Sequence, residues 1–218
     1  MYRESNRGPA NCALSVRPIA ATVAPMFAAL ALLFVVVIYR IVSGFAGSAD
    51  FQWLHNFAPV AAIALCGAVY LPRRTAIALP LVMLLVSDIV LNVFHYHQPL
   101  LTVEIIPRYL ALLLIGGLGL ALRGRANLLR LLGASAVGSV IFYIITNTGS
   151  WIYEPGYAKN AAGWLQAMTS GLPGFPPTWT FYRHTLISDL CFTALFYACL
   201  HATARSAEPA AERAVLAA

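Results

Sequence analysis

Long apolar stretches recur along the chain, and short polar segments separate them. A helix that crosses a membrane needs about 20 mostly apolar residues. Six stretches reach or approach this length, at residues 18–41, 57–71, 75–93, 105–122, 128–149 and 181–203. The pattern predicts an all-α fold, a polytopic membrane helix bundle with six transmembrane helices over residues 18–203. The second stretch is short and is flanked by Pro59 and Pro72.

The segments outside these stretches have a different character. Residues 1–17 and 204–218 are polar or rich in alanine and glutamate, and we expect them to be disordered tails. Residues 158–170 can form a helix on the membrane surface. The glycines and prolines of residues 171–177 then predict an irregular loop, because proline lacks an amide donor and glycine permits sharp turns.

Composition and charge favour the same class of protein. Of the 218 residues, 60% are hydrophobic and 10% are charged, whereas a soluble domain carries about 25% charged residues. The net charge of +6 comes from small, scattered clusters of arginine, which is unlike the continuous basic face of a nucleic-acid-binding protein. We therefore expect the lipid bilayer as a partner and no nucleic acid.

The basic residues also predict an orientation, because they favour the cytoplasmic side of membrane spans. With six spans and a cytoplasmic N-terminus, four of the 14 basic residues fall at the outer side: Arg40, Arg108, Lys159 and Arg183. The other ten fall inside: Arg3, Arg7, Arg17, Arg73, Arg74, Arg123, Arg125, Arg130, Arg205 and Arg213. We expect both termini to be cytoplasmic.

Polar side chains collect toward the predicted outer ends of the spans. Asp88, Asn92 and His95 follow one another at four and three residues, so they share one helix face. Asp189 lies roughly 12 Å along its helix from the outer end of the last span, at ~1.5 Å per residue. A charged side chain at mid-membrane costs at least ~2.5–3.5 kcal/mol. Both carboxylates should therefore face the bundle interior or a wet cavity.

These residues predict an outward-opening pocket between the third to sixth spans and the first outer loop. The candidate substrate-binding residues are Asn56, Asp88, Asn92, His95, Arg108, Asn147, Trp151, Thr185 and Asp189. The carboxylates would accept hydrogen bonds from a small polar or heterocyclic solute, the asparagines would orient it and Trp151 would stack on its ring. In the alternative, Asp88 and Asp189 pair with Arg108 or Arg183 and only fix helix packing.

No resident metal or cofactor is expected. His95 and His97 alone do not define a metal site, and no C-x-x-C pair occurs among Cys12, Cys66, Cys191 and Cys199. The chain also has no G-x-x-x-x-G-K-[ST] phosphate loop, so a transport role needs partner ATPases or an ion gradient.

Small residues on the first span suggest a close helix contact. Ala20, Ala24 and Ala28 stand at four-residue spacing, which lets a second helix approach closely. Two uses fit this pattern: packing inside the bundle and docking of a partner protein.

Four segments carry a family resemblance: Asn56-Phe57-Ala58-Pro59-Val60-Ala61-Ala62-Ile63-Ala64-Leu65, Pro80 to Asp88, Phe142-Tyr143-Ile144-Ile145-Thr146-Asn147 with Trp151, and Phe181-Tyr182-Arg183-His184-Thr185-Leu186 with Asp189. They resemble an uncharacterised bacterial family of six-helix membrane proteins. This family is defined by a domain of unknown function, and its members are described only as transport proteins. That family places Pro-Phe-Phe before the last span, whereas the prolines here stand earlier, at Pro173, Pro176 and Pro177.

In size and layout this family is distantly similar to the S components of energy-coupling-factor vitamin transporters. That resemblance implies a substrate-binding subunit of a bacterial cytoplasmic (inner) membrane, with multiple passes. It also implies a transmembrane coupling protein with ATPase subunits as partners, docked at Ala20, Ala24 and Ala28.

Two other functions compete with solute capture. Gly133-Ala134-Ser135-Ala136 superficially resembles the nucleophile motif of rhomboid intramembrane serine proteases. However, Ser135 lies near the inner end of its span and His184 near the outer end of the next, while a nucleophile and its base must come within about 2.6–3.2 Å. The protein is therefore expected not to be an enzyme. A small proton- or metal-linked carrier, with the carboxylates as a proton relay, is the other alternative.

Overall fold

The computed structural model describes the backbone of residues 19–45, 59–97, 99 and 103–216, and their side chains except those of 19–25, 96 and 207–216. These residues form helices and loops, without a strand in the described ranges, which confirms the all-α prediction. The α-helices are α1 (Ile19–Phe45), α2 (Val60–Tyr70), α3 (Ala78–Leu91), α4 (Ile105–Ala121), α5 (Leu128–Tyr153), α6 (Ala161–Met168) and α7 (Thr178–Leu216). A π-helical turn, η2 (Asn92–Tyr96), extends α3.

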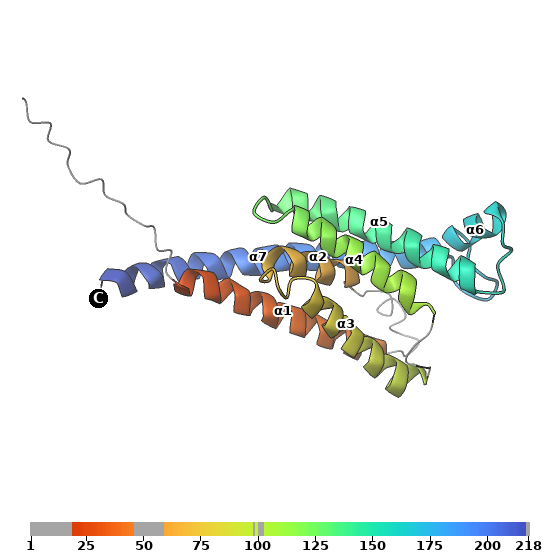
Figure 1. The fold of residues 1–218 in the computed structure, drawn as a ribbon, viewed down its shortest axis with the longest axis horizontal. Coiled ribbons are helices and arrows are strands. Elements are labelled where there is room, and N and C mark those ends of the chain that lie inside the picture. The colour runs from red at the N-terminus through yellow and green to blue at the C-terminus, as the bar shows by residue number, and fades with distance from the viewer. Residues whose placement is uncertain (1–18, 46–58, 98, 100–102, 217–218) are drawn as a thin grey trace, which may run out of the picture.

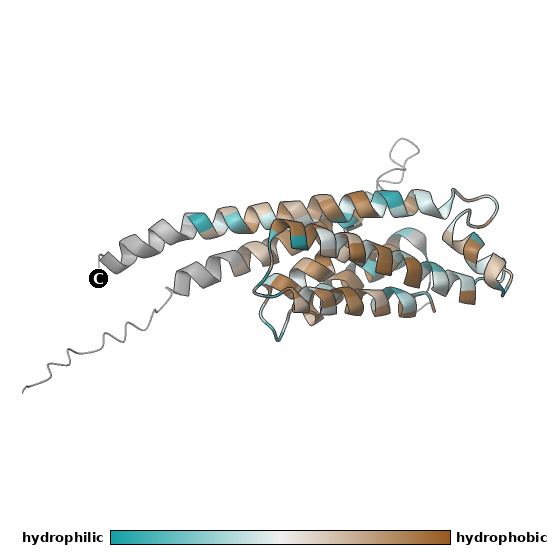
Figure 2. Cartoon of the chain, turned by 90° about the horizontal axis from the view of Figure 1, so that it is seen from above, coloured by the Kyte–Doolittle hydropathy of each residue, from teal (hydrophilic) through white to brown (hydrophobic). Residues whose placement is uncertain are grey.

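Four stretches of these helices are long and apolar enough to cross a membrane: Met26–Phe45, Ala78–His95, Leu128–Tyr153 and Thr178–Ser206. The protein is therefore a multi-pass membrane protein. All six predicted apolar stretches contain a helix, but α2 and α4 are shorter than these four apolar stretches. In Figure 2, hydrophobic colouring dominates the helices of the bundle, and hydrophilic colouring gathers mostly toward helix ends and loops.

Of the segments predicted to lie outside the spans, the C-terminal tail differs from the prediction and the surface segment agrees with it. The predicted C-terminal tail, 204–218, is helical as far as Leu216 because α7 continues through it; alanine, glutamate and arginine all favour helix. The predicted surface segment 158–170 contains α6, as expected. The N-terminal tail, 1–17, lies outside the described residues.

Helix α2 is the centre of the bundle. It contacts α1, α3, α4, α5 and α7, and all of its residues from Val60 to Val69 are buried. A helix that is apolar on every side is expected to be surrounded by other helices. Figure 1 shows that α2 is much shorter than its neighbours and lies toward the end of the bundle where α4 is joined to α5. Its 11 residues reach only about 16 Å at ~1.5 Å per residue.

Both ends of this short helix are capped by side chains from other segments. At its N-terminus, the first intrahelical hydrogen bond runs from the Ile63 amide to the Pro59 carbonyl oxygen. The Ala62 amide comes before this bond and donates instead to Asp189 Oδ1 of α7, at 3.0 Å. At its C-terminus, Arg123 donates to the carbonyl oxygens of Val69, at 3.3 Å, and Leu71. An acid at the N-terminus and a base at the C-terminus complement the helix dipole and satisfy terminal groups that lipid cannot satisfy.

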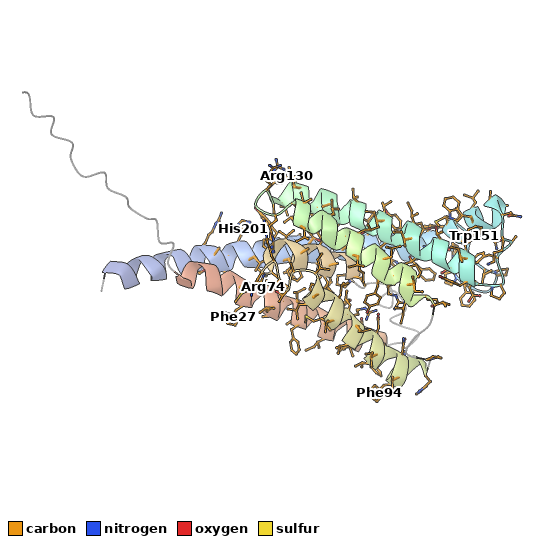
Figure 3. The ribbon with its side chains drawn as sticks, in the orientation of Figure 1. Phe27, Arg74, Phe94, Arg130, Trp151 and His201 are labelled. Carbon is orange, nitrogen blue, oxygen red and sulfur yellow. The ribbon has the colours of Figure 1, made fainter. Side chains whose placement is uncertain are left out.

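The two ends of the bundle differ in chemistry. Arg74, in the α2–α3 loop, and Arg130, in the first turn of α5, lie at the same end as His201 of α7, whereas Trp151 of α5 lies at the other end (Figure 3). Helix α6 lies at the same end of the bundle as Trp151 (Figures 1 and 3). The arginine-bearing loops therefore gather at one end, as expected for loops on the same side of a membrane.

Close packing of α2 against α4 depends on Gly119. A Cβ at this position would lie 2.6 Å from the Leu65 carbonyl oxygen and 2.8 Å from Ala68 Cβ. The contact to a backbone atom cannot be relieved by rotating a side chain, so only glycine allows this approach. By contrast, a Cβ at Gly117, on the same helix, would meet nothing within 4 Å.

We therefore expect Gly119→Ala to destabilise the protein by about 1–3 kcal/mol, the usual cost of overpacking. Gly117→Ala is the matched control, and the better helix propensity of alanine should leave its stability equal or slightly higher. Thermal unfolding of the purified proteins in detergent compares the two. Equal unfolding temperatures for both variants would contradict this packing.

Candidate functional site

Asp88 lies in a cluster of ion pairs that joins α1, α3 and α4. Its Oδ1 is 2.6 Å from Nη2 of Arg40, and its Oδ2 is 3.3 Å from Nη1 of Arg108 and accepts a hydrogen bond from the Tyr109 hydroxyl at 3.1 Å. Arg40 also donates to the Ser87 hydroxyl. The carboxylate side chain is only 5% exposed, so the cluster meets its need for partners inside the protein.

The pairing of Asp88 with Arg108 agrees with the alternative prediction, in which the carboxylates pair with arginines and fix helix packing. The stronger partner, Arg40, is not among the predicted site residues. The sequence does contain a signal for Arg40 as an ion-pair partner, because an arginine in an otherwise apolar span needs a counter-charge inside the bundle. The spacing of 48 residues between Arg40 and Asp88 gives no local pattern by which to choose the partner.

Asp189 is fully buried among α2, α5 and α7. Its Oδ1 accepts the amide of Ala62, and its Oδ2 lies 2.7 Å from Ser139 Oγ. No arginine or lysine of the described residues lies within 4 Å of it. Arg183, which the sequence offers as a partner, instead places its guanidinium 5.7 Å from the centre of the Trp179 ring. Asp189 is therefore held by hydrogen bonds alone.

Three hydroxyl side chains continue from Asp189 along the α5/α7 contact. Ser139 Oγ lies 3.0 Å from the carbonyl oxygen of Ser135, and the Thr193 hydroxyl donates to Ser135 Oγ at 3.0 Å. We call Asp189, Ser139, Ser135 and Thr193 the buried polar row, since each has 0% exposure. The prediction missed Ser139 and Ser135 as site residues. Their four-residue spacing, matched by Asp189 and Thr193 on α7, is the signal that could have found them.

A cavity of about 220 Å³ opens between α5 and α7 next to this row. Its described lining residues are aromatic or neutral-polar, and none of them is charged: Ser139, Phe142, Tyr143, Thr146, Asn147, Thr178, Phe181, Tyr182 and Thr185. We call it the α5/α7 pocket. The Asn147 amide donates to the Tyr143 carbonyl at 2.8 Å, and the rings of Tyr143 and Tyr182 pack with centroids 4.8 Å apart.

Two of the predicted site residues, Asn147 and Thr185, line the α5/α7 pocket directly. Asp189 adjoins it through Ser139. Asp88 and Arg108 belong instead to the ion-pair cluster. The single cavity expected from the sequence is therefore divided, in the described part of the chain, into a neutral pocket and a separate charged cluster.

The remaining predicted residues lie away from the pocket lining. The ring of His95 packs on Phe45 with centroids 5.2 Å apart, and Asn92 begins the π-helical turn. The indole of Trp151 donates to the Ala158 carbonyl at 2.9 Å, which ties α5 to the loop before α6. Asn56 lies outside the described residues.

The alanine stripe of α1 is only partly described. Ala28 packs against the hydrophobic core of the bundle. The side chains of Ala20 and Ala24 lie outside the described residues, so the docking role of this stripe stays a prediction.

The serine protease alternative finds no base beside its nucleophile in the described residues. Ser135 is fully buried, and its hydroxyl contacts Thr193. His184 lies nine residues before Thr193 on the same helix, or about 13 Å along its axis. Such a separation does not allow His184 to take a proton from Ser135.

The fold and the two polar sites define a helical multi-pass membrane protein with a buried acidic residue beside a neutral pocket. The chain belongs to the family of unknown function DUF6580, whose model matches residues 21–211. No curated protein and no solved structure matches it. The match confirms the expected membership of an uncharacterised family, while the resemblance to S components stays a prediction.

The contribution of the Arg40–Asp88 ion pair to stability can be tested with single and double variants. Asp88→Leu leaves the guanidinium of Arg40, 13% exposed, without a carboxylate, and breaking a buried pair costs about 3–5 kcal/mol. We expect Arg40→Met/Asp88→Leu to be more stable than Asp88→Leu in thermal unfolding. The control Arg108→Gln should cost about 0–1 kcal/mol, since Arg108 is half-exposed. Independent, additive losses in the double variant would contradict the coupling.

Proposed function

We propose that this protein captures a small polar or heterocyclic solute in the α5/α7 pocket, as the substrate-binding part of an uptake system. The observation that carries the proposal is the lining of this pocket, which combines aromatic faces with several neutral hydrogen-bonding groups beside a buried acid. Ligand sites typically combine apolar and aromatic walls with a few placed polar groups.

The chemistry of the lining favours an uncharged ligand with one ring. Phe142, Phe181 and Tyr182 supply surfaces on which a ring can stack, while Thr185 and Asn147 supply hydroxyl and amide groups. None of the described lining residues is charged, so these side chains would not compensate the desolvation of an ionic solute. At about 220 Å³, the cavity is smaller than the roughly 300–1,000 Å³ of sites for drug-sized ligands.

The place of the pocket along the bundle supports capture from outside the cell. It borders α5 from Ser139 to Asn147 and the first two turns of α7. Arg130 and Arg74 lie at the other end (Figure 3), and arginine-bearing loops favour the cytoplasm. In the proposed topology, six spans leave both termini cytoplasmic in a bacterial inner membrane, and the pocket opens outward. Uptake then draws on partner ATPases, through a transmembrane coupling protein, or on a proton gradient.

The pocket is tested by a matched pair of threonine variants on one helix. Thr185 lines the pocket, whereas Thr203 donates to the Cys199 carbonyl nearer the far end of α7. The protein is purified in mild detergent, small molecules that co-purify are identified by mass spectrometry, and the binding of the identified compound is measured. We expect Thr185→Val to weaken its binding about tenfold, as for loss of one hydrogen bond, and Thr203→Val to leave it unchanged.

A second variant addresses orientation of the solute. Asn147→Leu removes the amide and fills part of the cavity, so binding of the same compound should be lost while membrane insertion and thermal stability are retained. Unchanged binding in both Thr185→Val and Asn147→Leu would show that the solute binds elsewhere. An intact, purified protein that carries no small molecule and retains none from a library of neutral heterocycles would contradict solute capture itself.

A further inference from the structure

Asp189 is subject to two opposing effects. Its burial, with no basic partner among the described residues, disfavours the charged form, because a charge inside a membrane loses its hydration. The N-terminus of α2 favours the charged form, because the helix dipole and the hydrogen bond from the Ala62 amide both stabilise a carboxylate. The site therefore offers a stabilising interaction to each protonation state.

The hydrogen bonds around Ser139 suit the protonated state. Ser139 Oγ lies 2.7 Å from Asp189 Oδ2 and 3.0 Å from the carbonyl oxygen of Ser135. Both neighbours accept hydrogen bonds when Asp189 is ionised, but a serine hydroxyl has one proton to donate. When Oδ2 carries a proton, it donates to Ser139, which donates to Ser135, and both contacts are satisfied.

Among the residues that the structure describes, few other ionisable groups lie around this carboxyl group. The thiol of Cys66, on α2, interacts with Asp189 and Thr193. Helix α2 has no charged residue, and α5 has only Arg130, in its first turn. On α7, Arg183 and His184 stand six and five residues before Asp189. A metal ion does not suit the site, because an amide and a hydroxyl face the carboxyl oxygens, and the described residues hold no cluster of metal-ligating side chains.

We propose that Asp189 is a proton-binding site that exchanges its proton with the α5/α7 pocket through Ser139. Ser139 is the group common to both, since it borders the pocket and contacts Asp189. In the transfer, Ser139 Oγ gives its hydroxyl proton to a water or solute acceptor in the pocket and takes the proton from Oδ2. The serine is unchanged, the acceptor gains one positive charge, and a carboxylate remains with hydrogen bonds from Ser139 and Ala62.

This exchange would couple the proton to the solute, and in that respect it rests on the proposed function. A solute atom that accepts the hydroxyl of Ser139 leaves Oγ free to accept the Oδ2 proton, so it favours protonated Asp189. A solute atom that donates to Ser139 favours the carboxylate. Protons and solute then bind to neighbouring parts of one site, which is the arrangement that a proton-coupled carrier requires.

Infrared spectroscopy of the full chain in lipid tests the proton site without any solute, so its failure is distinct from failure of the proposed function. The chain has three aspartates, Asp50, Asp88 and Asp189. With carboxyl-¹³C aspartate, the variant Asp50→Asn/Arg40→Met/Asp88→Leu leaves Asp189 as the only labelled aspartate side chain, even if Asp189 itself cannot be replaced. It replaces both partners of the buried ion pair, so no buried guanidinium is left without a carboxylate. We expect its protonated carbonyl band to give way to the carboxylate band as pH is raised within the range where the protein stays folded.

The route is tested in the same labelled protein by transfer into D₂O at the acidic end of that range. The protonated band should shift as deuterium replaces the proton, and we expect Ser139→Ala to slow this shift about tenfold or more. Ser135→Ala is the matched control, one helical turn away in the buried polar row and outside the pocket lining, and should exchange like the parent. A carboxylate, or an acid, at every pH would overturn the proton site. Equal exchange in all three proteins would overturn the route through Ser139.

Discussion

The fold depends on the contact between Asp189 and the N-terminus of α2. Helix α2 is short, apolar on every side and in contact with five other helices, so the amides at its buried N-terminus need partners within the protein. In an apolar interior each unsatisfied backbone group costs several kcal/mol. Asp189 from α7 and Arg123 from the α4–α5 loop supply the missing partners. Asp189 and Arg123 therefore hold the central helix in place.

The same contact places the chemistry beside the pocket. Ser139 joins Asp189 to the α5/α7 pocket, so any group that binds there adjoins the capping carboxyl group of α2. The ion-pair cluster around Asp88 serves a different purpose, because Arg40 and Arg108 neutralise one carboxylate between α1, α3 and α4. The two intramembrane acids thus have separate environments: one is paired with cations and the other is surrounded by neutral donors.

Much of the architecture could be predicted because each apolar stretch reports on one helix at a time. All six predicted stretches contain helices, and Asn147 and Thr185 do line one pocket. Contacts between helices were harder to predict from the sequence, since neither the pairing of Arg40 with Asp88 nor the capping of α2 by Asp189 leaves a local sequence pattern. The shortness of α2 was hinted at by Pro59 and Pro72, and the helical extension of α7 to Leu216 by its composition.

The proposed function depends most directly on what occupies the space between α5 and α7. An experimental structure of the protein purified with its lipid and solute content measures this. We predict non-protein density in the α5/α7 pocket, in contact with Thr185 and Asn147, with Asp189 beneath it bonded to Ser139 and the α2 amide. A pocket filled by its own side chains, or a ligand bound instead at the Asp88 cluster, would contradict the account.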